Sequence, residues 1–69
     1  MIRNDRELQT TQERIAYFQR VLAQLRVTAA AEEFVLVASG YRTEIVRMQD
    51  EVLEYLTRHA SESVPVESA

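Results

Sequence analysis

Residues 41–56, YRTEIVRMQDEVLEYL, decide the fold of this chain. Within them Tyr41, Ile45, Met48, Val52 and Tyr55 recur at alternating intervals of four and three residues. That repeat places the five side chains on one face of an α-helix. Charged and polar residues fill most of the positions between them, so the stretch is predicted to be an amphipathic helix that buries one face against another helix.

This helix is predicted to cover about residues 29–59. The hydroxyl of Thr28 is a suitable N-terminal cap, and Glu32 and Glu33 then lie in the first turns, where acidic side chains are favoured by the helix dipole. The inward-facing stripe of the whole helix consists of Phe34, Ala38, Tyr41, Ile45, Met48, Val52, Tyr55 and His59.

Two features of this helix leave alternatives open. Residues 34–38, FVLVA, form a continuous apolar run with β-branched members, which is also typical of a buried strand. A strand here would lack a partner except in an edge-paired dimer, and the sequence after Tyr41 is periodic like a helix, so we predict helix. Gly40 costs about 1 kcal/mol relative to alanine inside a helix. It marks a bend, a close approach of another helix, or a break.

A similar stripe earlier in the chain predicts a helix over about residues 11–26. Thr10 or Thr11 is placed to cap it, and Glu13 can complete a capping box. Arg26, near the other end, suits the negative end of the helix dipole. The stripe consists of Leu8, Thr11, Ile15, Phe18, Leu22, Leu25 and Ala29.

Val27 and Thr28 are the predicted turn between the two helices. One unbroken helix through residues 29–31 is the alternative, because alanine is the best helix former. The predicted fold is all-α: a two-helix antiparallel hairpin over residues 1–60, which assembles into a four-helix bundle or coiled-coil oligomer. Residues 61–69, rich in serine and containing Pro65, are expected to form a flexible tail.

The composition indicates how so small a fold is stabilised. A chain of 69 residues buries only about 60% of the surface that it exposes when unfolded. Disulfides, a metal or oligomerisation usually supply the missing stability. The chain has no cysteine and one histidine, so neither a disulfide nor an ordinary zinc site is expected. Oligomerisation remains, and no cofactor is expected.

Charge is unevenly distributed along the sequence, although the net charge is only −3. Residues 1–30 contain five arginines and three acids, which gives +2, and residues 31–69 contain three arginines and eight acids, which gives −5. Such asymmetry can determine how chains pair. Ordinary solvated helix faces produce the same pattern.

The second predicted helix carries more apolar surface than one hairpin covers. Beside its inward stripe lies a second one, formed by Val46, Leu53 and Leu56. A helix that is apolar around much of its circumference has to be covered on more than one side. Two hairpins joined by closed two-fold symmetry would do so. We therefore predict self-association, as a homodimer or a higher homo-oligomer. The predicted interface residues are Ile15, Phe18, Leu22, Leu25, Phe34, Tyr41, Ile45, Met48, Val52, Leu53 and Leu56.

Sequence motifs for catalysis are missing from the chain. It contains no P-loop, dinucleotide-binding glycines or nucleophile elbow. Glu54 and His59 are five residues apart, whereas a di-iron bundle needs Glu-x-x-His. We expect a protein that is not an enzyme. Without an apolar run of the ~20 residues that span a bilayer, we expect a cytoplasmic location. The sequence pI of 5.0 argues against nucleic-acid binding.

The start of the chain resembles a known family. The residues that carry the resemblance are Met1, Ile2, Asn4, Arg6, Thr11, Phe18, Leu22, Ala23 and Leu25, with residues 41–56 matching more loosely. They are similar to the N-terminal helical hairpin of small bacterial antitoxin-like regulators of the Cro/cI-type helix-turn-helix class. Asp5, Glu7 and Leu8 depart from the family's opening. The resemblance does not include the DNA-binding domain that follows this hairpin in the family, so it implies assembly or partner binding in a bacterial, regulatory setting.

Two functional hypotheses follow. In the first, the chain is a non-catalytic adaptor that associates with itself through its amphipathic helices. In the second, it is an antitoxin-like or anti-regulator protein whose apolar surface binds one different protein. A nucleic-acid-associated regulator is the weaker form of the second hypothesis.

Overall fold

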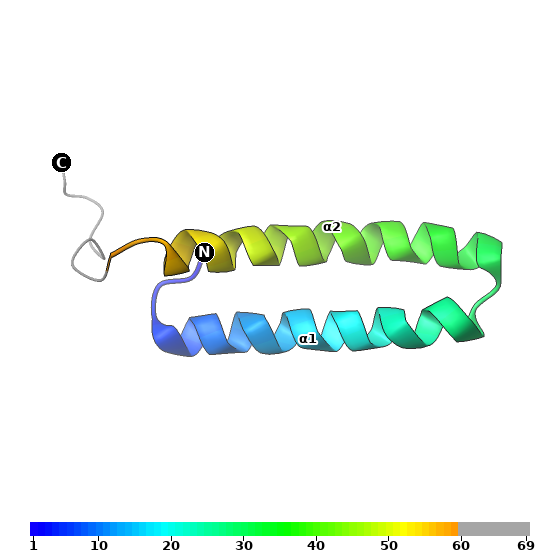
Figure 1. The fold of residues 1–69 in the computed structure, drawn as a ribbon, viewed down its shortest axis with the longest axis horizontal. Coiled ribbons are helices and arrows are strands. Elements are labelled where there is room, and N and C mark those ends of the chain that lie inside the picture. Colours follow the sequence, from blue (N-terminus) through cyan, green and yellow to red (C-terminus); the bar gives the residue numbers. More distant parts are fainter. Residues whose placement is uncertain (60–69) are drawn as a thin grey trace.

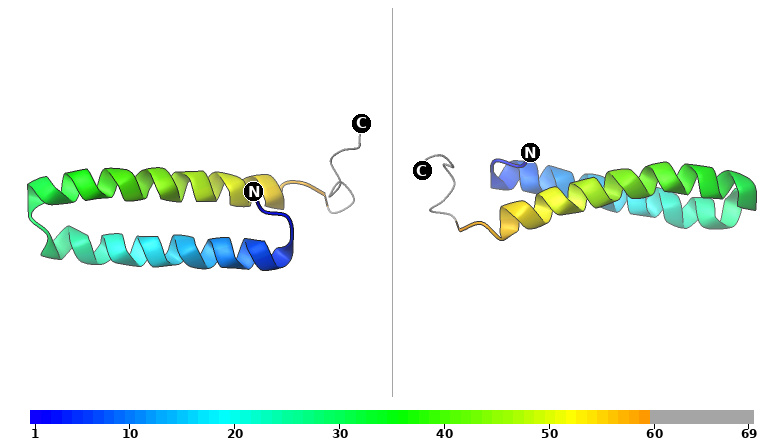
Figure 2. Two further views of the ribbon diagram at one scale, coloured as in Figure 1. Left: turned by 180° about the vertical axis from the view of Figure 1, so that it is seen from behind. Right: turned by 90° about the horizontal axis from the view of Figure 1, so that it is seen from above.

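Two long helices packed side by side form the molecule (Figure 1). The computed structural model describes residues 1–59, so the predicted tail at 61–69 lies outside the described residues. Helix α1 spans Asp5–Thr28 and helix α2 spans Ala31–Leu56. The two run antiparallel and cross at a shallow angle when seen from above (Figure 2). The predicted all-α hairpin is confirmed, and the alternatives of one unbroken helix and of a strand at residues 34–38 are both wrong.

Helix α1 begins six residues before the predicted start. Its N-terminal cap is Asn4, whose side-chain oxygen accepts a hydrogen bond of 2.8 Å from the backbone N–H of Glu7. The Glu7 carboxylate in turn accepts one of 2.8 Å from the backbone N–H of Arg3. The first hydrogen bond satisfies one of the N–H groups that a helix start leaves without a partner, and the second ties the preceding residue, Arg3, to the first turn. Thr10 and Thr11 lie inside the helix and do not cap it.

The turn lies at Ala29 and Ala30, two residues after the predicted one. Both alanines have extended backbone angles with negative φ, which any L-residue adopts, so the turn requires no glycine. Thr28 does not cap α2, because its hydroxyl instead donates to the carbonyl oxygen of Gln24 within α1, at 3.0 Å. Helix α2 therefore starts without a side-chain cap, and the backbone N–H of Phe34 bonds to the carbonyl of Ala30.

Helix α2 is continuous through Gly40, so this glycine does not break it. A Cβ added at Gly40 would meet no atom within 4 Å, which also excludes a close approach of α1. The helix ends at Leu56, three residues before the predicted end. Thr57 closes it, because its backbone N–H and its hydroxyl both donate to the carbonyl of Leu53. His59 therefore lies beyond the helix and is exposed.

The core is a single seam between the helices. At its centre Ile15 from α1 meets Ile45 and Met48 from α2, and Met48 is the most deeply buried, at 2% exposed. Next to them the rings of Phe18 and Tyr41 meet edge to face, with centroids 5.3 Å apart. Both predicted inward stripes are confirmed, except for His59. The stripe residues that are buried or half-buried are Leu8, Thr11, Ile15, Phe18, Leu22, Leu25, Ala29, Phe34, Ala38, Tyr41, Ile45, Met48, Val52 and Tyr55.

Candidate protein interface

The hairpin has two broad faces, and helix geometry assigns residues to each. One step along a helix rotates the chain by about 100°. Because α1 and α2 are antiparallel, a residue that follows an inward-facing one lies on the same face of the hairpin in both helices. Ala16, which follows Ile15, therefore shares a face with Val46, which follows Ile45. The residues that precede inward-facing ones lie on the opposite face.

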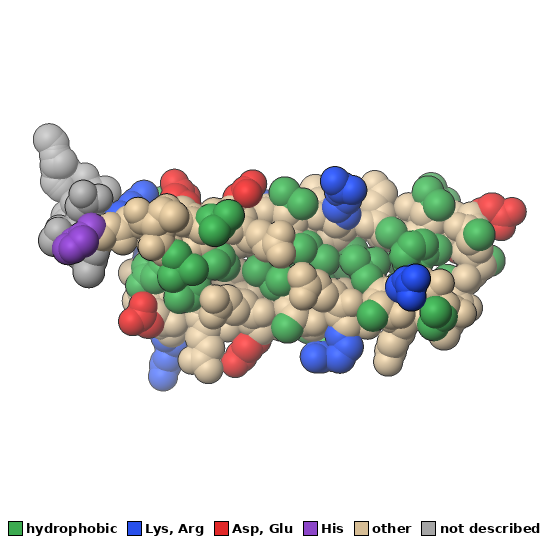
Figure 3. Space-filling view, viewed as in Figure 1, with side chains coloured by type: hydrophobic (Ala, Val, Ile, Leu, Met, Phe, Trp, Pro, Cys, Tyr) green, Lys and Arg blue, Asp and Glu red, His purple; other side chains and the backbone are tan. Residues whose placement is uncertain are grey.

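The first face contains no carboxylate along most of its length. We call it the carboxylate-free face, and acidic residues appear only beyond its ends, at Asp5 and Glu32. Its members on α1 and α2 are Gln9, Gln12, Ala16, Gln19, Ala23, Arg26, Val35, Ser39, Arg42, Val46, Gln49, Leu53 and Leu56. All of them are exposed in the single chain. In Figure 3, which looks onto this face, hydrophobic side chains gather along the seam and over α2, and acidic ones lie at the outer edges and ends.

The apolar part of this face belongs to α2. Val46 is 45% exposed, Leu53 59% and Leu56 56%, and Val35 at the other end of the helix is also exposed. The neighbouring part of α1 consists of uncharged glutamines and of the small side chains Ala16 and Ala23. The face as a whole therefore combines large apolar side chains on one helix with small or amide side chains on the other.

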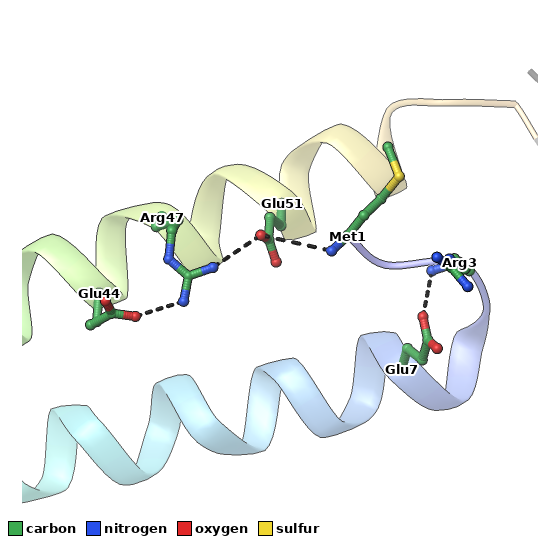
Figure 4. A network of polar contacts seen from close by, with 6 residues as sticks. All are labelled: Met1, Arg3, Glu7, Glu44, Arg47 and Glu51. Carbon is green, nitrogen blue, oxygen red and sulfur yellow. Dashed lines mark hydrogen bonds and ion pairs between the residues drawn. The ribbon is translucent and has the colours of Figure 1, made fainter.

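The opposite face is acidic and carries a polar network (Figure 4). Arg47 contacts Glu44 at 2.6 Å and Glu51 at 3.2 Å, and Glu51 also lies 3.9 Å from the amino group of Met1. Hydrogen bonding and charge attraction from Glu44, with a smaller contribution from Glu51, raise the pKa of Arg47 above its ordinary value. Exposed ion pairs of this kind are worth little individually. They do show that this face is solvated and charged.

Polar contacts also join the two helices at the open end of the hairpin. The hydroxyl of Tyr55 donates a hydrogen bond of 2.8 Å to Asp5. That hydrogen bond, together with partial burial, raises the pKa of Tyr55 above its ordinary value. Residues 1–4 run from the start of α1 across to the end of α2 (Figure 1), and Ile2 is buried there.

Most of the predicted interface residues occupy the intramolecular seam. Ile15, Ile45 and Met48 form the core, and Phe18, Leu22 and Val52 pack against it. The half-buried members of the set are Phe18, Leu22, Leu25, Phe34, Tyr41 and Val52. Leu53 and Leu56 differ from the rest, because more than half of each side chain is exposed. In the single chain these two are the members of the set that stay exposed to a partner.

Sequence reasoning missed the contribution of α1 to the carboxylate-free face. Ala16, Ala23 and the intervening Gln19 carry no hydrophobic signal of their own. The available signal was positional: each of the three follows an inward-facing residue of the stripe. Applied to both helices, that rule groups them with Val46 and Leu53.

None of the known proteins compared with this chain matches it: no family model, no curated protein and no solved structure. Functional inference therefore depends on the fold and on this surface. Within residues 1–59, no three His, Cys, Asp or Glu side chains gather as metal ligands would. In the same residues neither helix combines the length and the apolar character of a membrane-spanning segment.

Proposed function

We propose that this chain is a non-catalytic protein-interaction module that associates with copies of itself through the apolar flank of α2. The supporting observation is the exposure of Val46, Leu53 and Leu56 directly beside the core seam. Apolar side chains that line up on one flank of a helix usually mark a protein interface. An ordinary surface helix would place polar residues at these positions.

The small size of the core also supports self-association. Among the 59 described residues only four hydrophobic side chains are buried. Below 70 to 80 residues a single core rarely supplies more than about 3–5 kcal/mol of stability, and assembly is a common remedy. A second copy that covers the flank of α2 would bury further apolar area, at roughly 25 cal/mol for each Å².

Sedimentation equilibrium of the full chain at micromolar concentration tests this function. We expect a dimer or a larger closed oligomer. A folded, monodisperse monomer of 8.0 kDa would contradict the proposal. A stoichiometric complex with a different protein in place of the oligomer would favour the antitoxin-like alternative.

A matched pair of variants locates the interface. Val46 and Val37 are both valines of α2, 45% and 41% exposed, and they lie on opposite faces of the hairpin. We expect Val46→Glu to weaken assembly strongly, because it places a carboxylate within the apolar flank. Val37→Glu adds the same charge to a face that is already acidic, and should leave assembly intact. Equal effects of the two substitutions would count against the flank as the interface.

A further inference from the structure

We propose that the carboxylate-free face binds the same face of a second copy about a two-fold axis, so that α1 of each copy packs on α2 of the other. This inference rests on the proposed function and adds the surface that receives the apolar flank. That surface is the strip of α1 from Gln9 to Ala23, whose members on this face are glutamines and alanines. The assembly is then a closed four-helix dimer.

Side-chain size is complementary between the two helices of this face. On this face α2 carries the large apolar side chains Val46 and Leu53, and α1 carries the small Ala16 and the uncharged Gln9. Helices that pack closely oppose large side chains with small ones, as knobs fit into holes. A two-fold axis that stacks α1 on α2 of the other copy runs along the helices and keeps the register of the hairpin, in which Ile15 is level with Ile45 and Phe18 with Tyr41. Val46 of each copy therefore lies opposite Ala16 of the other, Leu53 opposite Gln9, and Ala23 opposite Ser39.

Charge favours contact between α1 and α2 over contact between two copies of α2. Helix α2 carries six acids and two arginines, a net charge of −4, and α1 carries three acids and four arginines, a net charge of +1. Two adjacent α2 helices would repel each other, whereas α1 against α2 brings opposite net charges together.

Desolvation also favours this face over the opposite one. The residues that belong to this face include no carboxylate from Gln9 to Arg26 on α1 or from Val35 to Leu56 on α2, so contact through this face takes no carboxylate of these stretches out of water. The two arginines of the face, Arg26 and Arg42, can cover apolar surface with their aliphatic stems and keep the charged group in water. On the opposite face, burial would remove the carboxylates around Arg47 from water.

The area of the face suits a stable dimer. A helix of 26 residues is about 39 Å long, and two packed helices are roughly 20 Å wide, so the face covers about 800 Å². Stable interfaces bury about 800 Å² on each partner. The hairpin therefore presents enough surface without a further domain.

Cysteine cross-linking between copies tests the pairing, since the natural chain contains no cysteine. Because the two-fold axis runs along the helices, both hairpins point the same way, and Ala16 of one copy lies level with Val46 of the other, as Ile15 lies level with Ile45 within one hairpin. When single variants Ala16→Cys and Val46→Cys are mixed and gently oxidised, we expect the mixed disulfide to dominate. Tyr17→Cys lies on the opposite face and should not form this disulfide with Val46→Cys. Disulfides between two Val46→Cys chains alone, with the thiol at residue 16 left free, would overturn the pairing.

A substitution on α1 separates this inference from the proposed function. We expect Ala23→Arg to weaken dimerisation on the order of tenfold or more, with α-helical circular dichroism retained at high concentration. Gln24→Arg, one residue further on and on the opposite face, should not weaken it. If the unchanged chain and Ala23→Arg dimerise equally, and Val46→Glu does not, self-association stands and the α1 strip is refuted. A monomeric unchanged chain would refute both.

Discussion

The hydroxyl of Tyr55 lies 2.8 Å from the carboxylate of Asp5, 50 residues away in the sequence, and donates a hydrogen bond to it. Asp5 is the first residue of α1, and Tyr55 lies in the last turn of α2. The hydrogen bond therefore joins the start of α1 to the end of α2, the two helix ends that lie farthest from the turn at residues 29–30. It fixes the helices in register at the open end of the hairpin.

Replacing Tyr55 by Phe is expected to lower the melting temperature slightly near neutral pH, because the hydrogen bond to Asp5 is lost and the ring is kept. The raised pKa of Tyr55 in the folded state gives this contribution a pH dependence. The contribution is fully present below about pH 10, where an unfolded tyrosine begins to ionise, and is lost as pH rises through the higher folded pKa. Thermal melts at neutral pH and above pH 10 should show the difference between the two proteins shrinking.

Lysine and cysteine side chains, which would add their own titrations near this pH range, are absent from the chain. Tyr17→Phe is the matched control: Tyr17 contacts Phe18 and Arg20 through its ring, and these contacts survive loss of the hydroxyl. If both tyrosine variants behave alike at every pH, the hydrogen bond to Asp5 makes no contribution to stability.

The cap at Asn4 gives a second prediction. Asn4→Ala removes the acceptor for the backbone N–H of Glu7, and such losses cost about 1 kcal/mol. Asn4→Asp keeps an acceptor and should retain stability. Thr10→Ala, at the position that the sequence suggested as a cap, should cost nothing, because Thr10 lies inside α1. Chemical denaturation of the three variants measures the differences in stability. A larger loss of stability for Thr10→Ala than for Asn4→Ala would contradict a helix that is capped by Asn4.

The seam of the hairpin was predictable because it is repetitive. In each helix the six intervals of three and four residues between inward-facing residues agree with one another, and one ambiguous residue does not change the result. The helix ends depend on single side chains that had competing choices. Thr28 could cap α2 or bond back to Gln24, and only the folded backbone shows that it does the second.

The surface was predictable in part, for a related reason. Leu53 and Leu56 are apolar, so their position beside the seam is visible in the sequence as a second stripe. Ala16 and Ala23 are acceptable anywhere in a helix, and their position on the same face as that stripe appears only when the antiparallel arrangement of both helices is known. A face that is defined by the absence of carboxylates can be recognised only after the residues that belong to it have been assigned from both helices.

Gly40 gives a third prediction. Gly40→Ala should stabilise the hairpin by about 1 kcal/mol, because alanine is a better helix former and its Cβ would meet no atom within 4 Å. Gly40 precedes Tyr41 and so lies on the acidic face, which the proposed dimer leaves in water. The gain should therefore be the same at low and at high protein concentration in thermal melts. A gain at low concentration that becomes a loss at high concentration would show that the acidic face is in contact with another copy.

Met48 and Leu53 distinguish the core from the proposed interface. Met48 is 2% exposed, so Met48→Ala should cost about 2–5 kcal/mol at any protein concentration, enough to unfold a domain of this size. Leu53 is 59% exposed in the single chain, where Leu53→Ala should change stability by only about 0.5 kcal/mol. If a second copy covers the flank, the loss of stability caused by Leu53→Ala instead grows as the protein concentration rises, because the substitution weakens the assembled state and that state becomes more populated. Denaturation curves measured over a hundredfold range of concentration would show a midpoint that separates progressively from that of the unchanged protein. A Leu53→Ala midpoint that stays parallel to the unchanged protein across that range would mean that no partner copy contacts this side chain.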